Sequence, residues 1–382
     1  MVIVLRVGVF YPTLNVYGGA EFVTAVIANS LAKNNYDVVL FTNEKVDQQE
    51  MEKFFGERLH PSIKVIVKPT MFRPRELIDF YQTIFRSYSF KLKCDIWIDV
   101  YSSRIYPWTN ICYIHFPYLN HYLFNRSFPY LKSGRFSHVG MTPYVFFEKN
   151  MVKYDKKLIL ANSRYTAEEI RRFSGAKAKV LYPPVPSIVF ETNTEELFKN
   201  PRKNLVITIS RFGPGKGLEN IPYIASLTNA RIKFAIIGRV HYKDTLLSLQ
   251  RSVKKLGLTK RVKFFPNISK NDMKKILISA KIYLHTMVGE HFGISVVEAM
   301  AMGCIPIVHN SGGAKEFVPA QYRYENLRDA ATKIETEIYE WTPEKAKETE
   351  KIAKRFSEEN FSKEFIKIFN QYIEEGNTVE KK

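Results

Sequence analysis

Short apolar segments alternate with helix-length segments along most of the chain, and this alternation occurs twice. The pattern predicts parallel β-sheets covered by helices, an α/β fold. In the first half, strands are predicted at residues 3–10, 38–42, 63–67, 96–100 and 158–161; in the second half, at residues 205–209, 234–237, 262–265, 282–285 and 305–308. Helices are predicted from Gly18-Gly19 to about Lys33, from Thr342-Pro343 onwards, and from about 358 to 375 with Gly376 as the stop.

A proline-rich segment separates the two halves. Residues 182–186 read Tyr-Pro-Pro-Val-Pro, and proline cannot donate a backbone hydrogen bond inside a sheet. We therefore predict two doubly wound, Rossmann-like domains that face each other across a cleft, over residues 1–181 and 187–355, with 182–186 as the linker. Residues 356–382 are predicted to form a helix and tail that pack back towards the first domain. Ligands of such sheets bind outside the carboxyl ends of the strands.

The charge balance indicates an anionic partner. Lysine and arginine outnumber the acids by 57 to 38, which gives a net charge of +19. Nucleic acid, a phospholipid surface and a phosphorylated substrate all fit this excess, and so does solubility charge without a partner. The three cysteines are too few and too scattered for a disulfide framework. No leader peptide and no uncharged apolar run of ~20 residues is evident, so we expect a cytoplasmic protein.

Two glutamates flank a glycine and the apolar beginning of a predicted helix. Glu290 and Glu298 stand eight positions apart, with Gly293 between them. One interpretation is structural: Ser295 and Glu298 have the Ser-x-x-Glu spacing of a capping box, which satisfies two backbone amides at a helix start. The other is functional, because carboxylates accept hydrogen bonds from vicinal sugar hydroxyls. The spacing alone leaves both open.

Five segments of the chain, taken in sequence order, resemble those of the retaining glycosyltransferases of family GT4, which have the GT-B fold. The stretch from Glu290 through Glu298 to Gly303 resembles the family's Glu-x7-Glu signature. The other four are Gly18-Gly19-Ala20-Glu21, Asn162 to Thr166 with the 182–185 segment, Ser210-Arg211-Phe212 with Lys216-Gly217, and Ser311-Gly312-Gly313 with Glu316.

The resemblance implies a role for each matching residue. Arg211 and Lys216 would stabilise the departing nucleoside diphosphate, where two fixed cations oppose the developing negative charge. Glu290 would contact the hydroxyls of the donor sugar, and Glu298 would bind the ribose. His115 would lie near the reacting carbon, although a lone histidine is often structural. The remaining expected donor-binding residues are Gly18, Gly19, Gly238, Arg239, Phe292, Gly293, Ile294 and Ser295.

We expect no metal and no cofactor, since the nucleotide sugar is a substrate. The chain has no Asp-x-Asp motif, and its His and Cys residues are not spaced as ligands. The resemblance implies front-face substitution, in which the leaving phosphate takes the proton of the acceptor hydroxyl. A non-catalytic module that binds sugar nucleotides or nucleic acid on the same fold is the alternative. A dehydrogenase is disfavoured, because the first strand leads to Gly18-Gly19 without Gly-x-Gly-x-x-Gly.

The acceptor side is predicted from an unusual composition in the first half. Residues 101–147 contain no Asp or Glu and many aromatics, and residues 72–93 mix aromatics with cations. Both suit an anionic lipid surface, although two core helices with basic ends would also explain them. The Glu-His-Phe-Gly variant is similar to mannosyltransferases of lipid-linked oligosaccharide assembly. That resemblance implies transfer of mannose from a GDP- or UDP-sugar to a glycan or lipid-linked glycan, peripherally on the cytosolic membrane face and without nucleic acid.

Overall fold

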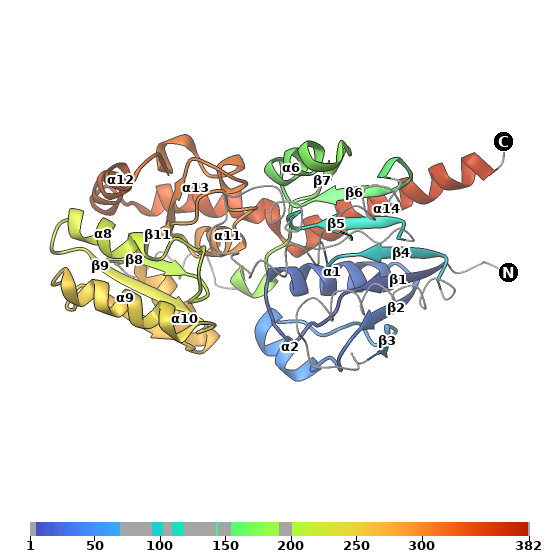
Figure 1. Ribbon diagram of the computed structural model, residues 1–382, viewed down its shortest axis with the longest axis horizontal. Helices are drawn as coiled ribbons and strands as arrows, with labels where there is room; N and C mark the ends of the chain where they lie inside the picture. Colours follow the sequence, from blue (N-terminus) through green and yellow to red (C-terminus); the bar gives the residue numbers. More distant parts are fainter. Residues whose placement is uncertain are drawn as a thin grey trace. The chain divides into compact units, whose positions relative to one another are not determined.

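The computed structural model divides the chain into two compact units. Unit 1 comprises Met1–Pro186 and Glu358–Lys382, and unit 2 comprises Ser187–Ser357. The residues that the structure describes are 5–68, 94–101, 109–117, 143, 154–190 and 201–380. Each unit is built around its own parallel sheet with helices packed against it (Figure 1).

The described part of unit 1 holds a seven-stranded parallel sheet in the order β3-β2-β1-β4-β5-β6-β7. The strands are β1 (Arg6–Phe10), β2 (Asp37–Thr42), β3 (Lys64–Val67), β4 (Ile96–Asp99), β5 (Ile111–Ile114), β6 (Leu158–Ala161) and β7 (Lys179–Val180). The helices are α1 (Gly19–Lys33), α2 (Gln48–Phe55), α6 (Arg164–Ser174) and α14 (Glu358–Glu380). The strands β4, β5 and β6 are almost entirely buried. Strands covered on both faces of a sheet are mostly apolar, and this explains the apolar runs in the sequence.

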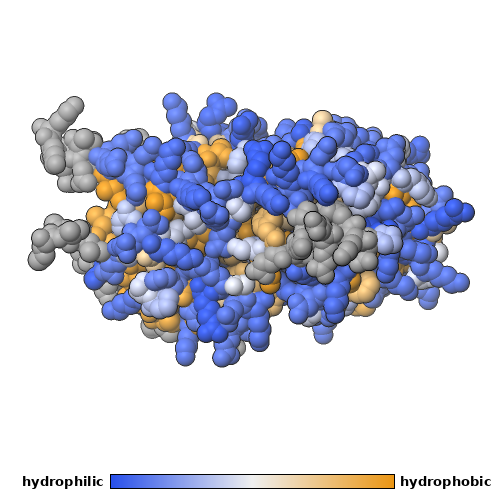
Figure 2. Space-filling view, turned by 180° about the vertical axis from the view of Figure 1, so that it is seen from behind, coloured by the Kyte–Doolittle hydropathy of each residue, from blue (hydrophilic) through white to orange (hydrophobic). Residues whose placement is uncertain are grey.

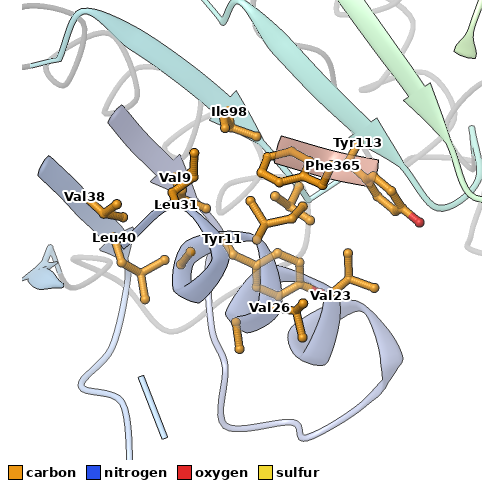
Figure 3. Packing of buried hydrophobic residues seen from close by; sticks show 14 of the residues in the cluster. Val9, Tyr11, Val23, Val26, Leu31, Val38, Leu40, Ile98, Tyr113 and Phe365 are labelled. Carbon is orange, nitrogen blue, oxygen red and sulfur yellow. The ribbon is translucent and has the colours of Figure 1, made fainter. Parts of the chain in front are cut away.

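The last helix of the chain completes the core of unit 1. Phe365 on α14 is 1% exposed and packs in one cluster with Val23 and Leu31 of α1 and Ile98 of β4 (Figure 3). The α1–α14 contact also includes a hydrogen bond of 2.8 Å between the hydroxyls of Ser30 and Ser362. Residues more than 300 positions apart in the sequence therefore share one hydrophobic core.

The expectation that α14 ends at Gly376 is wrong. The helix continues to Glu380, and a Cβ on Gly376 would meet no atom within 4 Å. A glycine in an exposed helical position costs only about 1 kcal/mol relative to alanine, so it weakens the helix without ending it.

The described part of unit 2 holds a six-stranded parallel sheet in the order β10-β9-β8-β11-β12-β13. The strands are β8 (Lys203–Ile209), β9 (Lys233–Gly238), β10 (Val262–Pro266), β11 (Ala280–His285), β12 (Ile305–His309) and β13 (Arg323–Tyr324). The helices are α8 (Asn220–Leu227), α9 (Lys243–Lys255), α10 (Lys270–Ser279), α11 (Ile294–Ala301), α12 (Leu327–Tyr339) and α13 (Pro343–Ala353). The five predicted strands are confirmed; β13 has two residues, too few for a sequence pattern.

Each sheet has a point at which the direction of winding reverses. In unit 1 it lies between β1 and β4, and in unit 2 between β8 and β11. The loops after the two strands at such a point diverge, which leaves room for a ligand at their carboxyl ends. The ends of β8 and β11 are therefore where a site in unit 2 is expected.

Polar residues cover most of the face shown in Figure 2, and hydrophobic residues appear between them in separate areas. Among the helices of the described segments, none is both long and apolar enough to cross a bilayer.

Truncation of Phe365 tests whether α14 is part of the core of unit 1. We expect Phe365→Ala to lower the free energy of unfolding by about 3–5 kcal/mol, because it leaves a cavity between α14 and α1. Chemical denaturation measures the change. Lys367→Ala, at an exposed position of the same helix, is the control and should cost less than about 0.5 kcal/mol. Equal denaturation midpoints for Phe365→Ala and Lys367→Ala would contradict the packing of Phe365 in the core of unit 1.

Candidate active site

Three charged or polar side chains meet at the winding reversal of unit 2. The Glu290 Oε2 atom lies 3.0 Å from His285 Nε2 and 3.5 Å from Lys216 Nζ. His285 is the last residue of β11, and Lys216 follows β8, so the two strands at the reversal supply both partners. The Glu290 side chain is only 12% exposed, and that of Lys216 is 27% exposed. The carboxylate is thus largely buried and held from two sides.

The backbone fixes the loop that carries Glu290. The Gly313 amide donates to the Glu290 carbonyl at 2.6 Å, and the His291 amide donates to Glu290 Oε1 at 3.0 Å. Gly312 has φ +72°, and a Cβ there would lie 2.3 Å from the Glu290 carbonyl oxygen. A residue with a side chain cannot occupy that position without moving the loop. The Ser-Gly-Gly segment therefore sets where the Glu290 backbone lies.

The surroundings of Glu290 keep its carboxyl group ionised. Burial by itself would raise its pKa, because a low-dielectric environment disfavours the charged form. The charge of Lys216, together with His285 and His291, outweighs this and holds the pKa of Glu290 well below its usual range. The site therefore presents a carboxylate, able to accept hydrogen bonds, at neutral pH.

The capping-box interpretation of Ser295 and Glu298 is wrong. Helix α11 begins at Ile294 with Gly293 as its N-cap residue, so Ser295 lies inside the first turn. The Ser295 hydroxyl is instead paired with that of Tyr283 on β11, at 2.8 Å. A capping box needs the serine at the N-cap position, where its oxygen faces the free amides. Gly293 takes that position with φ +104°, a conformation that favours glycine.

The Glu298 side chain is half-buried and, within the described residues, makes no hydrogen bond or ion pair. Burial raises the pKa of its carboxyl group, and Lys270 opposes this. It lies on the first turns of α11, whose initial residues Ile294 and Ser295 have amides without an intrahelical acceptor. The ring of Phe292 is buried against Phe317. Only the backbone of Phe292 could therefore contact a donor.

The expected residues after β8 and β9 lie side by side. The Phe212 amide donates to the Arg239 carbonyl at 2.8 Å, and this bond joins the loops that carry Arg211 and Arg239. A Cβ on Gly238 would lie 1.7 Å from the Ser210 carbonyl oxygen, so this close approach requires glycine. Both arginines are exposed. Partial burial and then the charges of Arg211 and Arg239 lower the pKa of His241, which places these groups in one cationic environment.

Gly18 and Gly19 form the beginning of α1 in unit 1. Gly18 is the N-cap residue, and its amide donates to Glu21 Oε2 at 2.9 Å. The other oxygen of Glu21 accepts from the Tyr11 hydroxyl at 3.0 Å. A carboxylate of the chain itself therefore binds the Gly18 amide at this helix N-terminus.

His115 follows β5, also in unit 1, and is neutral. Burial lowers its pKa to about 4, and a hydrogen bond with the Val100 backbone opposes this. Its Nε2 atom is buried without a hydrogen-bond partner among the described residues. A neutral imidazole can accept or donate through that atom, whereas an imidazolium can only donate.

His285 is a site residue that the sequence reasoning missed. It is 5% exposed, and its carbonyl accepts from the Tyr324 hydroxyl at 3.1 Å. The signal was present, because His285 ends a predicted strand five residues before Glu290. Within the described ranges, no three His, Cys, Asp or Glu side chains gather as metal ligands would.

Solved structures identify the fold as GT-B. The Anabaena HepE structure in complex with UDP and glucose matches 96% of this chain and 100% of its own, with a TM-score of 0.71 and 17% identity. Sucrose-phosphate synthase from Thermosynechococcus elongatus matches 97% of this chain and 99% of its own, with a TM-score of 0.75 and 14% identity. At these identities the likeness establishes the fold, which is that of GT-B glycosyltransferases.

Sequence comparison finds a family model and relatives that this chain resembles. Residues 189–338 match the glycosyl transferases group 1 family. The GDP-Man:Man(3)GlcNAc(2)-PP-Dol alpha-1,2-mannosyltransferase of Dictyostelium discoideum is 29% identical over 318 residues, 72% of this chain and 62% of the relative. The protein of the same name from Homo sapiens is 25% identical over 421 residues, 94% of this chain and 85% of the relative. The chain thus spans less than two thirds of the first relative's length.

Removal of Lys216 tests its effect on Glu290. We expect Lys216→Ala to raise the pKa of Glu290, because the positive charge of Lys216 lowers that pKa in the parent protein. NMR titration of the Glu290 carboxyl group measures the shift.

Arg211→Ala is the matched control for this shift. Arg211 is not among the groups that lower the pKa of Glu290, so its loss should leave that pKa unchanged. Equal pKa values of Glu290 in Lys216→Ala and in the parent protein would contradict the coupling of Lys216 to Glu290.

Proposed function

We propose that this protein is a metal-independent, retaining GT4 mannosyltransferase that transfers mannose from GDP-mannose to a lipid-linked glycan. The relatives' name gives GDP-mannose and the dolichol-linked acceptor for those proteins, and the 94% of this chain aligned with the human relative supports the same chemistry here. A UDP-sugar is the second candidate donor, because the HepE structure that shares the fold contains UDP and glucose.

The observation that carries the proposal is the buried Glu290 carboxylate, held by Lys216 and His285 where the loops after β8 and β11 diverge. Burial of an isolated carboxylate costs several kcal/mol, so a fold keeps one only with compensating partners. Here the partners hold it ionised at the sheet edge where ligands of this architecture bind. Vicinal hydroxyls of a sugar are donors that suit such a carboxylate.

In the proposed reaction, the chain's own residues bind the donor and stabilise its leaving group. Lys216 and Arg211 would oppose the negative charge that develops on the diphosphate, without the need for a metal ion. Glu290 would orient the sugar through its hydroxyls, and Glu298 would bind the ribose. His115 is proposed to act from unit 1 as a neutral hydrogen-bonding group, in agreement with its lowered pKa.

The proposed acceptor side remains a prediction from the sequence. The basic and aromatic residues 72–93 lie outside the described residues, and so do residues 101–147 except for 101, 109–117 and 143. The chemistry of these segments, cations interleaved with aromatics, supports peripheral attachment to the cytosolic face of an anionic membrane.

The choice of donor is tested by thermal unfolding with GDP-, UDP- and ADP-sugars in EDTA. A ligand at 100 times its Kd stabilises the folded state by about 2.7 kcal/mol. We expect GDP-mannose to raise the melting temperature most, and its hydrolysis to persist in EDTA. Stabilisation by UDP-sugars alone would indicate that the donor is a UDP-sugar and not GDP-mannose. Binding of a sugar nucleotide without its hydrolysis would favour a non-catalytic module. Loss of hydrolysis in EDTA with rescue by manganese would contradict metal independence.

The two glutamates are expected to affect different parts of the donor. Glu298→Gln should weaken binding of GDP and of GDP-mannose roughly equally, because the ribose is common to both. Glu290→Gln should leave the affinity for GDP nearly unchanged and weaken binding of the intact donor. Isothermal calorimetry with both ligands measures the difference. The assignment fails if Glu290→Gln weakens GDP binding as much as Glu298→Gln does.

A further inference from the structure

Charge is unevenly distributed within unit 2. Residues 245–271 contain seven Lys and Arg and no Asp or Glu. Residues 325–357 of the same unit contain seven Lys and Arg and eight acids. The first segment comprises most of α9, the following turn, β10 and the first residues of α10; the second comprises α12 and α13. The positive charge of this unit is therefore concentrated at one place on its surface.

Most of the cations at that place are exposed and make no ion pair within the described part of the chain. Five of them are exposed, and none makes an ion pair with another described residue: Arg251, Lys254, Lys255, Lys260 and Lys263, hereafter the corner cations. On α12 and α13, by contrast, Lys333 pairs with Asp329, Lys345 with Glu337, and Lys354 with Glu350. The helix dipole explains a preference for Lys254 and Lys255 in the last turn of α9, but it does not explain the other three.

The corner cations are far from the site in unit 2 along the sheet. Helix α9 ends where β10 begins, at the amino ends of the parallel strands, whereas Lys216 and Glu290 lie beyond the carboxyl ends. β10 is the edge strand, hydrogen-bonded to β9 alone in the described sheet, and Figure 1 shows α9 beside β9. The phosphates of a donor at the carboxyl ends therefore do not account for these charges.

Aliphatic side chains are exposed among the cations. Leu256, next to Lys255, is 42% exposed, and Leu247, one helical turn before Arg251, is 45% exposed. Nucleic-acid surfaces combine cations with aromatic rings that stack on bases. Exposed leucines between lysines instead match the interface of a bilayer, where aliphatic groups enter the boundary of the acyl chains and ammonium groups meet the lipid phosphates.

We propose that the corner cations, with Leu247 and Leu256, form a contact surface for an anionic phospholipid membrane. Each cation near an anionic leaflet strengthens binding about fivefold. Apart from Leu247, which is in the second turn of α9, these residues lie towards the amino ends of the strands of unit 2. The surface contains no residue of 72–147 and does not depend on the identity of the donor or acceptor.

Co-sedimentation of the full chain with phosphatidylcholine vesicles, with and without phosphatidylserine, tests this proposal. The test variant is Arg251→Gln/Lys254→Gln/Lys255→Gln, and the matched control is Arg328→Gln/Lys347→Gln/Lys351→Gln on α12 and α13. We expect the test variant to bind phosphatidylserine vesicles about 100-fold more weakly than the parent, and the control to bind as the parent does. Binding should weaken as salt shortens the Debye length from ~10 Å at 0.1 M to ~3 Å at 1 M.

A second variant guards against a folding defect in α9. Lys260→Gln/Lys263→Gln changes the turn and β10 alone and should weaken binding about 25-fold, with an unchanged melting temperature. The proposal is overturned if the parent does not prefer phosphatidylserine vesicles, or if both corner variants bind like the control. It is also overturned if both variants lose affinity for a single-stranded RNA while vesicle binding stays constant, because the surface would then be a nucleic-acid site.

Discussion

The buried carboxylate of Glu290 is the constraint on which the site in unit 2 depends. A charge that is 12% exposed must be compensated, and the compensation comes from both strands at the winding reversal, through Lys216 after β8 and His285 at the end of β11. The Gly313 amide binds the Glu290 carbonyl and joins the loop after β12 to the same point. The segments after β8, β11 and β12 are thereby joined at one residue, Glu290.

This arrangement explains why glycines accompany the charged residues. A Cβ on Gly312 would collide with the Glu290 backbone, and a Cβ on Gly238 would collide with Ser210. Close backbone approach at these glycines brings the loops that carry the charged residues together. Unit 1 relies on a different constraint, since α14 must cover the hydrophobic face of α1 to close its core.

Much of the fold could be predicted from the sequence, because a parallel strand buried on both faces is a short apolar run. Local patterns were ambiguous at two places, where one interpretation of the sequence differs from the structure. Ser295 and Glu298 have the spacing of a capping box, yet Tyr283 pairs with the Ser295 hydroxyl and Gly293 is the N-cap residue. Gly376 has the residue type that ends helices, yet α14 continues past it. Residue type and spacing do not reveal which neighbour from another element is present.

The sequence by itself determined that the chain forms parallel α/β sheets and that its five motif segments resemble GT4, since strand periodicity and motif spacing are local properties. The tertiary structure alone decided which strands are neighbours, and hence that His285, Lys216 and Glu290 meet. It also decided that the corner cations make no ion pair with another described residue. These features depend on distances between residues remote in sequence, and such distances are set by how helices and strands pack together.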